Sequence, residues 1–280
     1  MPKHRTRTDA AGAASCPDAS CYDALRWPVS KYEAPEGLAS RGRHTRGHIS
    51  WGLWVMLAIF HPMADLIFRR EVRHPERIPA HGPAILVANH VSITDPVSFA
   101  RAVWDAGRIP QFLAKSTLYR GFAGVILRSA GQIPVYRATS AAQDSLRAAI
   151  AALERGELIC IYPEGTVTRD PDWWPMVAKN GVARLVMAVD APVIPIGQWG
   201  PQLTHDYHTK KWSVFPRKRT ICKVGVPLDL SAYRGKQVTV DLLRAITDEV
   251  MVGVREQLAE IRQEQPPERF YRDARTGADE

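Results

Sequence analysis

A histidine and an aspartate with four residues between them stand out in the segment NHVSITDP, residues 89–96. His90 and Asp95 follow the apolar run AILVA, which predicts a turn at the end of a buried strand. Pro96 suits the first position of a helix, so Asp95 can cap this helix and still present an oxygen to His90. An imidazole oriented by a carboxylate is a general base that can take a proton from an alcohol as the alcohol attacks an acyl carbon. On this spacing alone, an ordinary helix cap beside a turn histidine is the alternative.

Two further segments carry charged residues at predicted strand ends. In GQIPVYR, residues 131–137, Arg137 has a planar fork of donors that can clamp a phosphate, although a solvated surface arginine is the alternative. In YPEGTVTRD, residues 162–170, a tight turn can offer amides to an oxyanion and can aim Glu164 into a cleft, to hold a substrate hydroxyl or orient a cation. The alternative is that Pro-Glu-Gly forms an ordinary surface turn with no role in function.

Short apolar runs and helical stretches alternate from residue 72 onward. The expected strands are AILVA, QFLA, QIPVY, LICIY and PVIPIG, several of them continuously apolar, as in strands covered on both faces. Residues 140–155 and 243–261 have helical spacing, and the second helix ends before Pro266. This alternation predicts an α/β fold with a mostly parallel or mixed central sheet flanked by helices, in which functional residues gather at the carboxyl ends of strands.

In this order the four blocks, including the apolar strand APVIPIG, resemble the glycerolipid acyltransferase family. That family includes the 1-acylglycerol-3-phosphate acyltransferases, and its blocks run NHxxxxD, GxIxxxR, PEGT and an apolar VPIxP-like strand. The resemblance covers residues 70 to 200 and implies a glycerol-phosphate acyltransferase-like fold. Four ordered blocks are far more specific than any one of them.

The resemblance implies an activity and roles for three residues. A fatty acyl group would pass from acyl-CoA or acyl carrier protein to the free hydroxyl of 1-acylglycerol-3-phosphate (lysophosphatidic acid), giving phosphatidic acid. His90 would be the general base, Asp95 its orienting partner and Asn89 a support for the turn, with direct attack and no acyl-enzyme. The alternative acceptors are glycerol-3-phosphate, another lysophospholipid or a glycosylated lipid. A distant alternative is a non-catalytic protein that binds membranes or nucleic acid.

The resemblance also implies which residues hold the acceptor: Lys115, Arg137, Glu164, Gly165 and Thr166. One position departs from the family pattern, because Val167 stands where an arginine usually follows Gly-Thr. Arg169, two residues further on, is the candidate to replace that arginine.

Composition limits the classes of function. The 280 residues carry a formal charge of +8, which favours an anionic partner: nucleic acid, a lipid surface, or an acidic substrate such as a phosphate or coenzyme A. Cys16, Cys21, Cys160 and Cys222 have neither zinc-ligand nor disulfide spacing, and the nine histidines include no HExxH pattern. We therefore predict no metal requirement and no cofactor other than the acyl donor as co-substrate.

Four segments are expected along the chain. Residues 1–48 form a disordered basic leader, 49–70 an apolar membrane-associating helical segment, 71–265 the acyltransferase domain and 266–280 a loose tail. The apolar segment falls short of the ~20 uninterrupted apolar residues of a spanning helix. An interfacial or re-entrant helix pair hinged at Pro62 is favoured, and a helix packed on the domain is the alternative.

Localisation follows from basic flanks and from the lack of a secretory signal pattern. Arginines lie on both sides of the apolar segment, and the loop of residues 205–219 mixes lysines and arginines with Trp212 and Phe215. We predict a peripheral or monotopic protein on the cytoplasmic face of the cell membrane. The expected partners are the acyl donor, lysophosphatidic acid and the membrane surface, with no nucleic acid.

Overall fold

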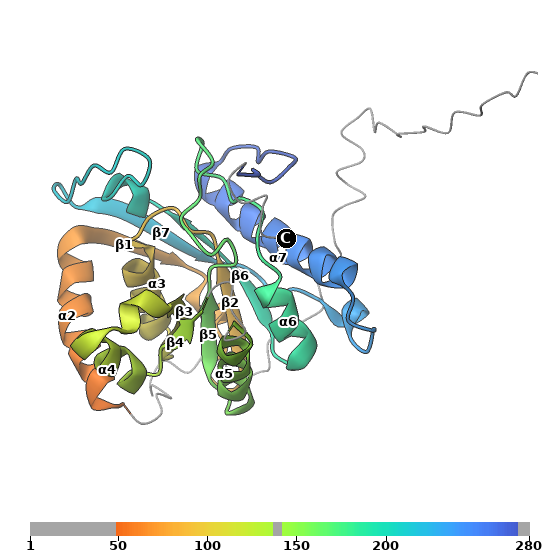
Figure 1. The fold of residues 1–280 in the computed structure, drawn as a ribbon. Coiled ribbons are helices and arrows are strands. Elements are labelled where there is room, and N and C mark those ends of the chain that lie inside the picture. Colours follow the sequence, from red (N-terminus) through yellow and green to blue (C-terminus); the bar gives the residue numbers. More distant parts are fainter. Residues whose placement is uncertain (1–48, 137–141, 274–280) are drawn as a thin grey trace, which may run out of the picture. The chain divides into compact units, whose positions relative to one another are not determined.

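The structure is a computed structural model that describes residues 49–136 and 142–273. The predicted leader, Arg137 and residues 274–280 lie outside the described residues. The described part is an α/β fold built on a seven-stranded sheet in the order β1-β7-β6-β2-β5-β3-β4 (Figure 1). All neighbouring strands run parallel except β6 and β7, so the predicted mostly parallel, mixed sheet is confirmed.

The strands are β1 (Phe68–Arg73), β2 (Ala84–Ala88), β3 (Pro110–Lys115), β4 (Ile133–Val135), β5 (Leu158–Ile161), β6 (Val193–Trp199) and β7 (Lys218–Val224). The helices are α2 (Trp51–Ile67), α3 (Asp95–Asp105), α4 (Gly121–Ser129), α5 (Ala142–Glu154), α6 (Gly181–Ala188) and α7 (Val240–Arg262). The five strands expected from apolar runs and the two expected helices are present. Strands β1 and β7 were not predicted, because their charged residues interrupt the apolar pattern by which the other strands were recognised.

Different helices cover the two faces of the sheet (Figure 1). Along β2, Ile85 and Val87 join the core formed with α5, α6 and α7, whereas Leu86 and Ala88 join the core formed with α3. Successive side chains of a strand point to opposite faces, and all of β2 is buried. β2 is therefore covered on both faces, which explains its uninterrupted apolar sequence.

The segment expected to be a helix pair hinged at Pro62 is one continuous helix, α2, with Pro62 inside it. That expectation was wrong because both ends of the helix are tied to the domain. Ser50 caps its first turn and donates to the carbonyl of Ser129 at the end of α4, while Ala64 is buried near the other end. Pro62 has no backbone N–H, so one hydrogen bond inside the helix is missing. The contacts at both ends keep the helix continuous despite this loss.

Helix α2 packs on α3 and α4 with one side and leaves large apolar side chains in solvent on the other. Gly52 and Leu53 are buried. The side chains that are more than half exposed are Trp51, Trp54, Ile59 and Leu66. Across residues 49–136 and 142–273, no helix combines the length and apolar character needed to cross a bilayer.

Part of the segment expected to be a loose tail returns to the domain. The Tyr271 carbonyl accepts from the Val177 amide at 2.9 Å, and the buried Asp273 carboxylate pairs with Arg169. The expectation was therefore wrong for these residues, since their polar groups find partners on the loop that follows β5. Residues 274–280 lie outside the described residues.

Candidate active site

The predicted catalytic residues and Glu164 come from loops that follow the carboxyl ends of the central strands. Strand β2 lies between β5 and β6, and all three run parallel. The carboxyl ends of these strands therefore meet, and the turns that follow β2 and β5 are neighbours. This arrangement brings residues 89–96 against residues 162–168.

His90 and Asp95 form a hydrogen-bonded pair. The Nδ1 atom of His90 lies 2.9 Å from Oδ2 of Asp95, and the same oxygen accepts the backbone amides of Val91 at 2.6 Å and Ser92 at 3.0 Å. The Asp95 side chain is fully buried, whereas 15% of the His90 side chain is exposed. Because a carboxylate can only accept, Nδ1 carries the proton and Nε2 is left as the basic nitrogen.

Glu164 is buried and holds the turn through both of its carboxylate oxygens. One of its oxygens accepts the His90 amide at 2.9 Å and the other accepts the Met176 amide at 3.0 Å. Burial raises the pKa of Glu164 to about 8, although the two amide donors act in the opposite direction. The carbonyl of His90 also accepts from the Thr168 amide at 2.7 Å. Both backbone polar groups of His90 are therefore fixed by the segment after β5.

An amide network joins the turn to β6. The Asn89 side chain donates to the Gln198 carbonyl at 3.0 Å and accepts from the Gln198 amide at 2.7 Å. The Gln198 side chain in turn donates to the Asn89 carbonyl at 3.3 Å and to the Tyr162 hydroxyl at 3.2 Å. The network ties the start of the His90 turn to the neighbouring strand.

The Tyr162 ring stacks on the His90 imidazole, with centroids 4.3 Å apart and planes inclined by 21°. Sequence reasoning assigned no role to Tyr162 or Gln198. The only available signal for Tyr162 was its position at the end of β5, directly before Pro163 and Glu164. Gln198 gave no signal, because it reaches Asn89 only through strand pairing.

The predicted acceptor-binding residues are less closely grouped. Gly165 adopts a φ of +70° in the turn, where an added Cβ would lie 3.8 Å from the Lys179 side chain. Thr166 beside it is partly exposed. Arg169 is paired with Asp273 instead of standing free. Lys115 is exposed at the end of β3. The structure thus brings Glu164 to the His90 pair, while Arg169 is engaged elsewhere.

No metal centre is apparent in the described ranges. Between residues 49 and 136 and between 142 and 273, no three His, Cys, Asp or Glu side chains gather closely enough to hold an ion. The described cysteines, Cys160 and Cys222, are buried with free thiols, and burial raises the pKa of each thiol. These thiols are therefore poor nucleophiles or ligands.

Residues 69–199 match the family model described as Acyltransferase. This range contains the His90–Asp95 pair, Glu164 and the strands that position them. The similarity to this family therefore extends over a little less than half of the chain.

Individual relatives carry more specific names. The chain is 29% identical over 145 residues to 1-acyl-sn-glycerol-3-phosphate acyltransferase beta from Homo sapiens, covering 51% of this chain and 50% of the human protein. It is 31% identical over 124 residues to a 1-acyl-sn-glycerol-3-phosphate acyltransferase from Borreliella burgdorferi, covering 43% of this chain and 47% of that protein. The chain thus spans about half the length of these curated relatives.

The fold is similar to that of a crystal structure from Thermotoga maritima, the 1-acyl-sn-glycerophosphate (LPA) acyltransferase PlsC. The TM-score is 0.55 at 24% sequence identity, and the match covers 77% of this chain and 82% of the other. At this identity the likeness extends to the fold alone.

Proposed function

We propose that this protein transfers a fatty acyl group from acyl-CoA or acyl carrier protein to the free hydroxyl of 1-acylglycerol-3-phosphate, giving phosphatidic acid. The observation that carries the proposal is the pair of His90 and Asp95, in which Nδ1 is bound by a buried carboxylate and the imidazole is still partly exposed. The names of the relatives support the choice of acceptor.

The proposed reaction needs no acyl-enzyme. Nε2 of His90 takes the proton of the acceptor hydroxyl as its oxygen attacks the thioester carbonyl carbon. A carbon–oxygen bond forms, the carbon–sulfur bond of the tetrahedral intermediate breaks, and the imidazolium returns its proton to the departing thiolate. Asp95 keeps the ring in the required tautomer and stabilises the imidazolium.

The acceptor phosphate needs cationic or amide donors near this pair. We assign this role to Arg137, Lys115 and the turn at Gly165 and Thr166. Arg169 is a weaker candidate, because its guanidinium is already neutralised by Asp273. Glycerol-3-phosphate, another lysophospholipid or a glycosylated lipid are alternative acceptors, and they require the same catalytic pair.

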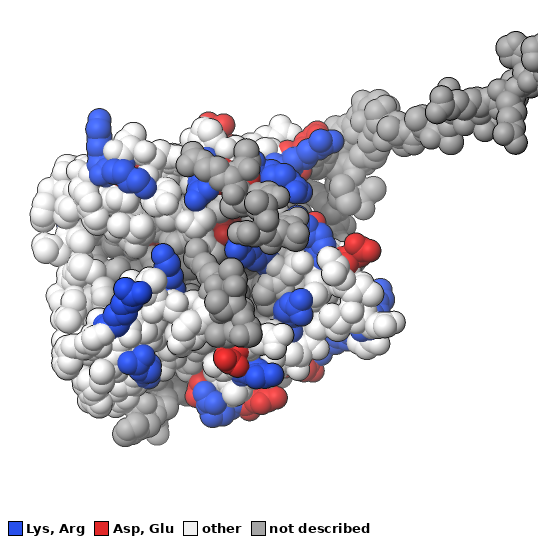
Figure 2. Space-filling view, in the orientation of Figure 1, with Lys and Arg blue, Asp and Glu red and all other residues white. Residues whose placement is uncertain are grey.

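The acceptor and product are membrane lipids, and α2 supplies a surface suited to reach them. Its exposed Trp51 and Trp54 have amphipathic rings that favour the membrane interface. Phe122 at the start of the neighbouring α4 is 73% exposed. In Figure 2 the surface over α2 and α4 is mostly uncharged, broken by single Lys or Arg residues. We propose peripheral association through this surface on the cytoplasmic face of the membrane.

Release of free thiol from oleoyl-CoA in detergent, with and without 1-acylglycerol-3-phosphate, tests the proposal. Release should depend on the acceptor, and His90→Ala should lower it by about 10²–10⁴-fold, the usual contribution of a general base. His81→Ala, at an exposed histidine outside the site, is the matched control. Full turnover by His90→Ala would refute the assignment of His90 as the base. Thiol release that is the same with and without each acceptor would refute acyl transfer to an alcohol.

A further inference from the structure

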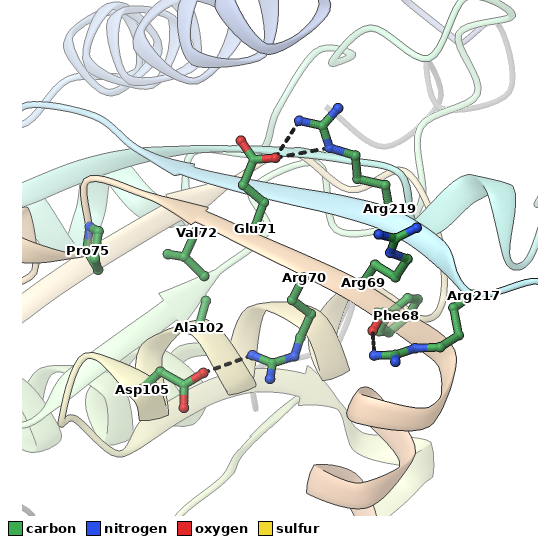
Figure 3. Close-up of a pocket in the computed structure, with 10 residues that line it drawn as sticks. All are labelled: Phe68, Arg69, Arg70, Glu71, Val72, Pro75, Ala102, Asp105, Arg217 and Arg219. Carbon is green, nitrogen blue, oxygen red and sulfur yellow. Dashed lines mark hydrogen bonds and ion pairs between the residues drawn. The ribbon is translucent and has the colours of Figure 1, made fainter.

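A cavity lies beside β1, the outermost strand at one side of the sheet (Figure 3). It has a volume of about 910 Å³ and is lined by β1, by the residues leading into β7 and by α3. Neither His90, Asp95 nor Glu164 lines it. Two of its arginines, Arg217 and Arg219, lie beyond residue 199, where the match to the acyltransferase family ends. The family match therefore covers the part of the cavity formed by β1 and α3, but not Arg217 and Arg219.

Four arginines and two carboxylates line the cavity, but the charges are unevenly paired. Arg70 binds Asp105 at 2.8 Å and also Asp65 at 2.6 Å, so it is neutralised. Arg219 donates from two nitrogens to one oxygen of Glu71, at 3.0 and 2.6 Å. Figure 3 shows these two ion pairs on opposite sides of β1.

The other two arginines are not matched by a carboxylate among the described residues. Arg217 donates one Nη2 hydrogen bond to the Phe68 carbonyl at 2.6 Å, which fixes its guanidinium beside the start of β1. Arg69 is exposed and stands in register with Arg219 on the neighbouring parallel strand, so both project from the same side of the sheet. The cavity therefore presents two guanidinium groups with donors available for an anion, Arg69 beside Arg219 and Arg217 beside Phe68 (Figure 3).

The guanidinium fork matches the oxygens of a phosphate, and two exposed apolar residues lie two positions before Phe68 and Arg217, which line the cavity. Leu66 at the end of α2 is 58% exposed, and Phe215, two residues before Arg217, is 64% exposed. A soluble phosphate has no apolar part that could contact these side chains. A phospholipid can place its phosphate on the arginines and its apolar part against these side chains.

We propose that this cavity binds the phosphate of an anionic phospholipid headgroup, as a lipid site separate from the site of acyl transfer. The inference rests on the proposed membrane association of α2, because the cavity begins where α2 ends. It assigns the two contributions to different elements: α2 binds any bilayer through apolar side chains, and Arg69 with Arg217 adds a preference for anionic lipid.

Vesicle flotation of the full chain tests this site, with vesicles of phosphatidylcholine alone or mixed with phosphatidylglycerol. The native chain should prefer the mixed vesicles, and Arg69→Ala should reduce that preference about five-fold, the effect of one basic residue at an anionic surface. Arg147→Ala removes the same charge from the exposed side of α5 and should leave the preference unchanged. Arg69 has no partner among the described residues whose loss would disturb the fold.

Three results would overturn the proposal. Equal binding to both kinds of vesicle would mean that no anionic headgroup is recognised. An equal loss in Arg69→Ala and Arg147→Ala would mean that only the total charge matters. Calorimetry with inorganic phosphate is the third arm, because phosphate binding that depends on Arg69 without a vesicle preference would assign the cavity to a soluble anion. Flotation measures binding and needs no thioester, so His90→Ala should retain the preference for anionic vesicles. The thiol-release assay tests the proposed activity independently of this site.

Discussion

His90 is held in place by residues that come from different parts of the chain. Its ring nitrogen is bound by Asp95, its ring face by Tyr162 and its backbone amide by Glu164. Only Asp95 is a sequence neighbour. Because catalysis by a general base depends on a fixed direction of the accepting nitrogen, the residues that hold the turn should affect turnover more than substrate binding.

Glu164→Gln distinguishes a positioning role from a substrate-binding role. The amide replaces one carboxylate oxygen with a donor, so either the His90 or the Met176 amide faces another N–H group. We expect kcat to fall about tenfold or more, since a lost buried hydrogen bond costs about 1–3 kcal/mol, while the KM for the acceptor changes little. Steady-state kinetics measure both values, with exposed Glu154→Gln as the control. A large rise in KM with unchanged kcat would instead indicate that Glu164 binds the acceptor.

The raised pKa of Glu164 also predicts a pH dependence. Its pKa is about 8 in the fold against an ordinary 4.5, so its stabilising contribution is complete below pH 4.5 and is lost as the pH rises through 8. The ionised form is the one that accepts two amides, so activity should rise as the pH passes through about 8. Denaturant unfolding and kinetics at several pH values should show these opposite trends, and Glu164→Gln should remove both. Identical profiles for the native and variant chains would contradict this assignment.

At the scale of elements, the crossing of α2 over α4 depends on a missing side chain. A Cβ atom at Gly52 would lie 2.6 Å from the Ile126 carbonyl oxygen and 2.6 Å from Cβ of Ser129. The helices could not approach this closely with any other residue, and the position of α2 is what exposes Trp54 and Ile59 on its outer side.

Gly52→Ala should therefore destabilise the protein by about 1–3 kcal/mol, the usual range for overpacking a tight contact. Gly181→Ala is a matched control, because a Cβ there meets nothing within 4 Å and the residue begins α6. The control should be neutral or slightly stabilising, by up to about 1 kcal/mol. Denaturant unfolding measures both free energies, and equal stability of the two variants would show that α2 is not held by this crossing.

At the scale of the whole described chain, Arg262 joins three segments distant in sequence. At the end of α7, its guanidinium lies 4.1 Å from the ring centroid of Trp174 and 4.5 Å from that of Trp199. It also donates to the Asp172 carbonyl at 2.6 Å. The loop after β5, the end of β6 and α7 are thus held together close to the segment that carries Glu164.

Arg262→Lys keeps the charge but loses the planar stacking group. We expect a loss of about 1–2 kcal/mol in the free energy of unfolding, since two cation–π contacts of about 0.5–1 kcal/mol each are weakened. Arg147→Lys, on the exposed side of α5, should change stability far less. Unfolding curves for both variants measure the difference, and equal stability would mean that the two tryptophan contacts contribute nothing.

The local patterns were sufficient to predict much of this protein. Continuous apolar runs indicated β2 and β5 because strands covered on both faces have no polar side. The short spacing of His90 and Asp95 allowed their contact, because one turn can bring the two side chains together. Such features depend only on neighbours along the chain. The edge strand β1 was missed because its run of charged residues has no apolar pattern, and only pairing with β7 makes it a strand.

Tertiary structure alone decided which distant residues meet. Glu164 reaches the His90 amide across 74 positions, and Gln198 reaches Asn89 across 109. Asp273 is 104 positions from Arg169, and this ion pair engages a predicted phosphate ligand. Many strand orders satisfy the same apolar runs, so these contacts do not follow from spacing. They arise because β5 and β6 pair on either side of β2 and carry their loops to the same edge of the sheet.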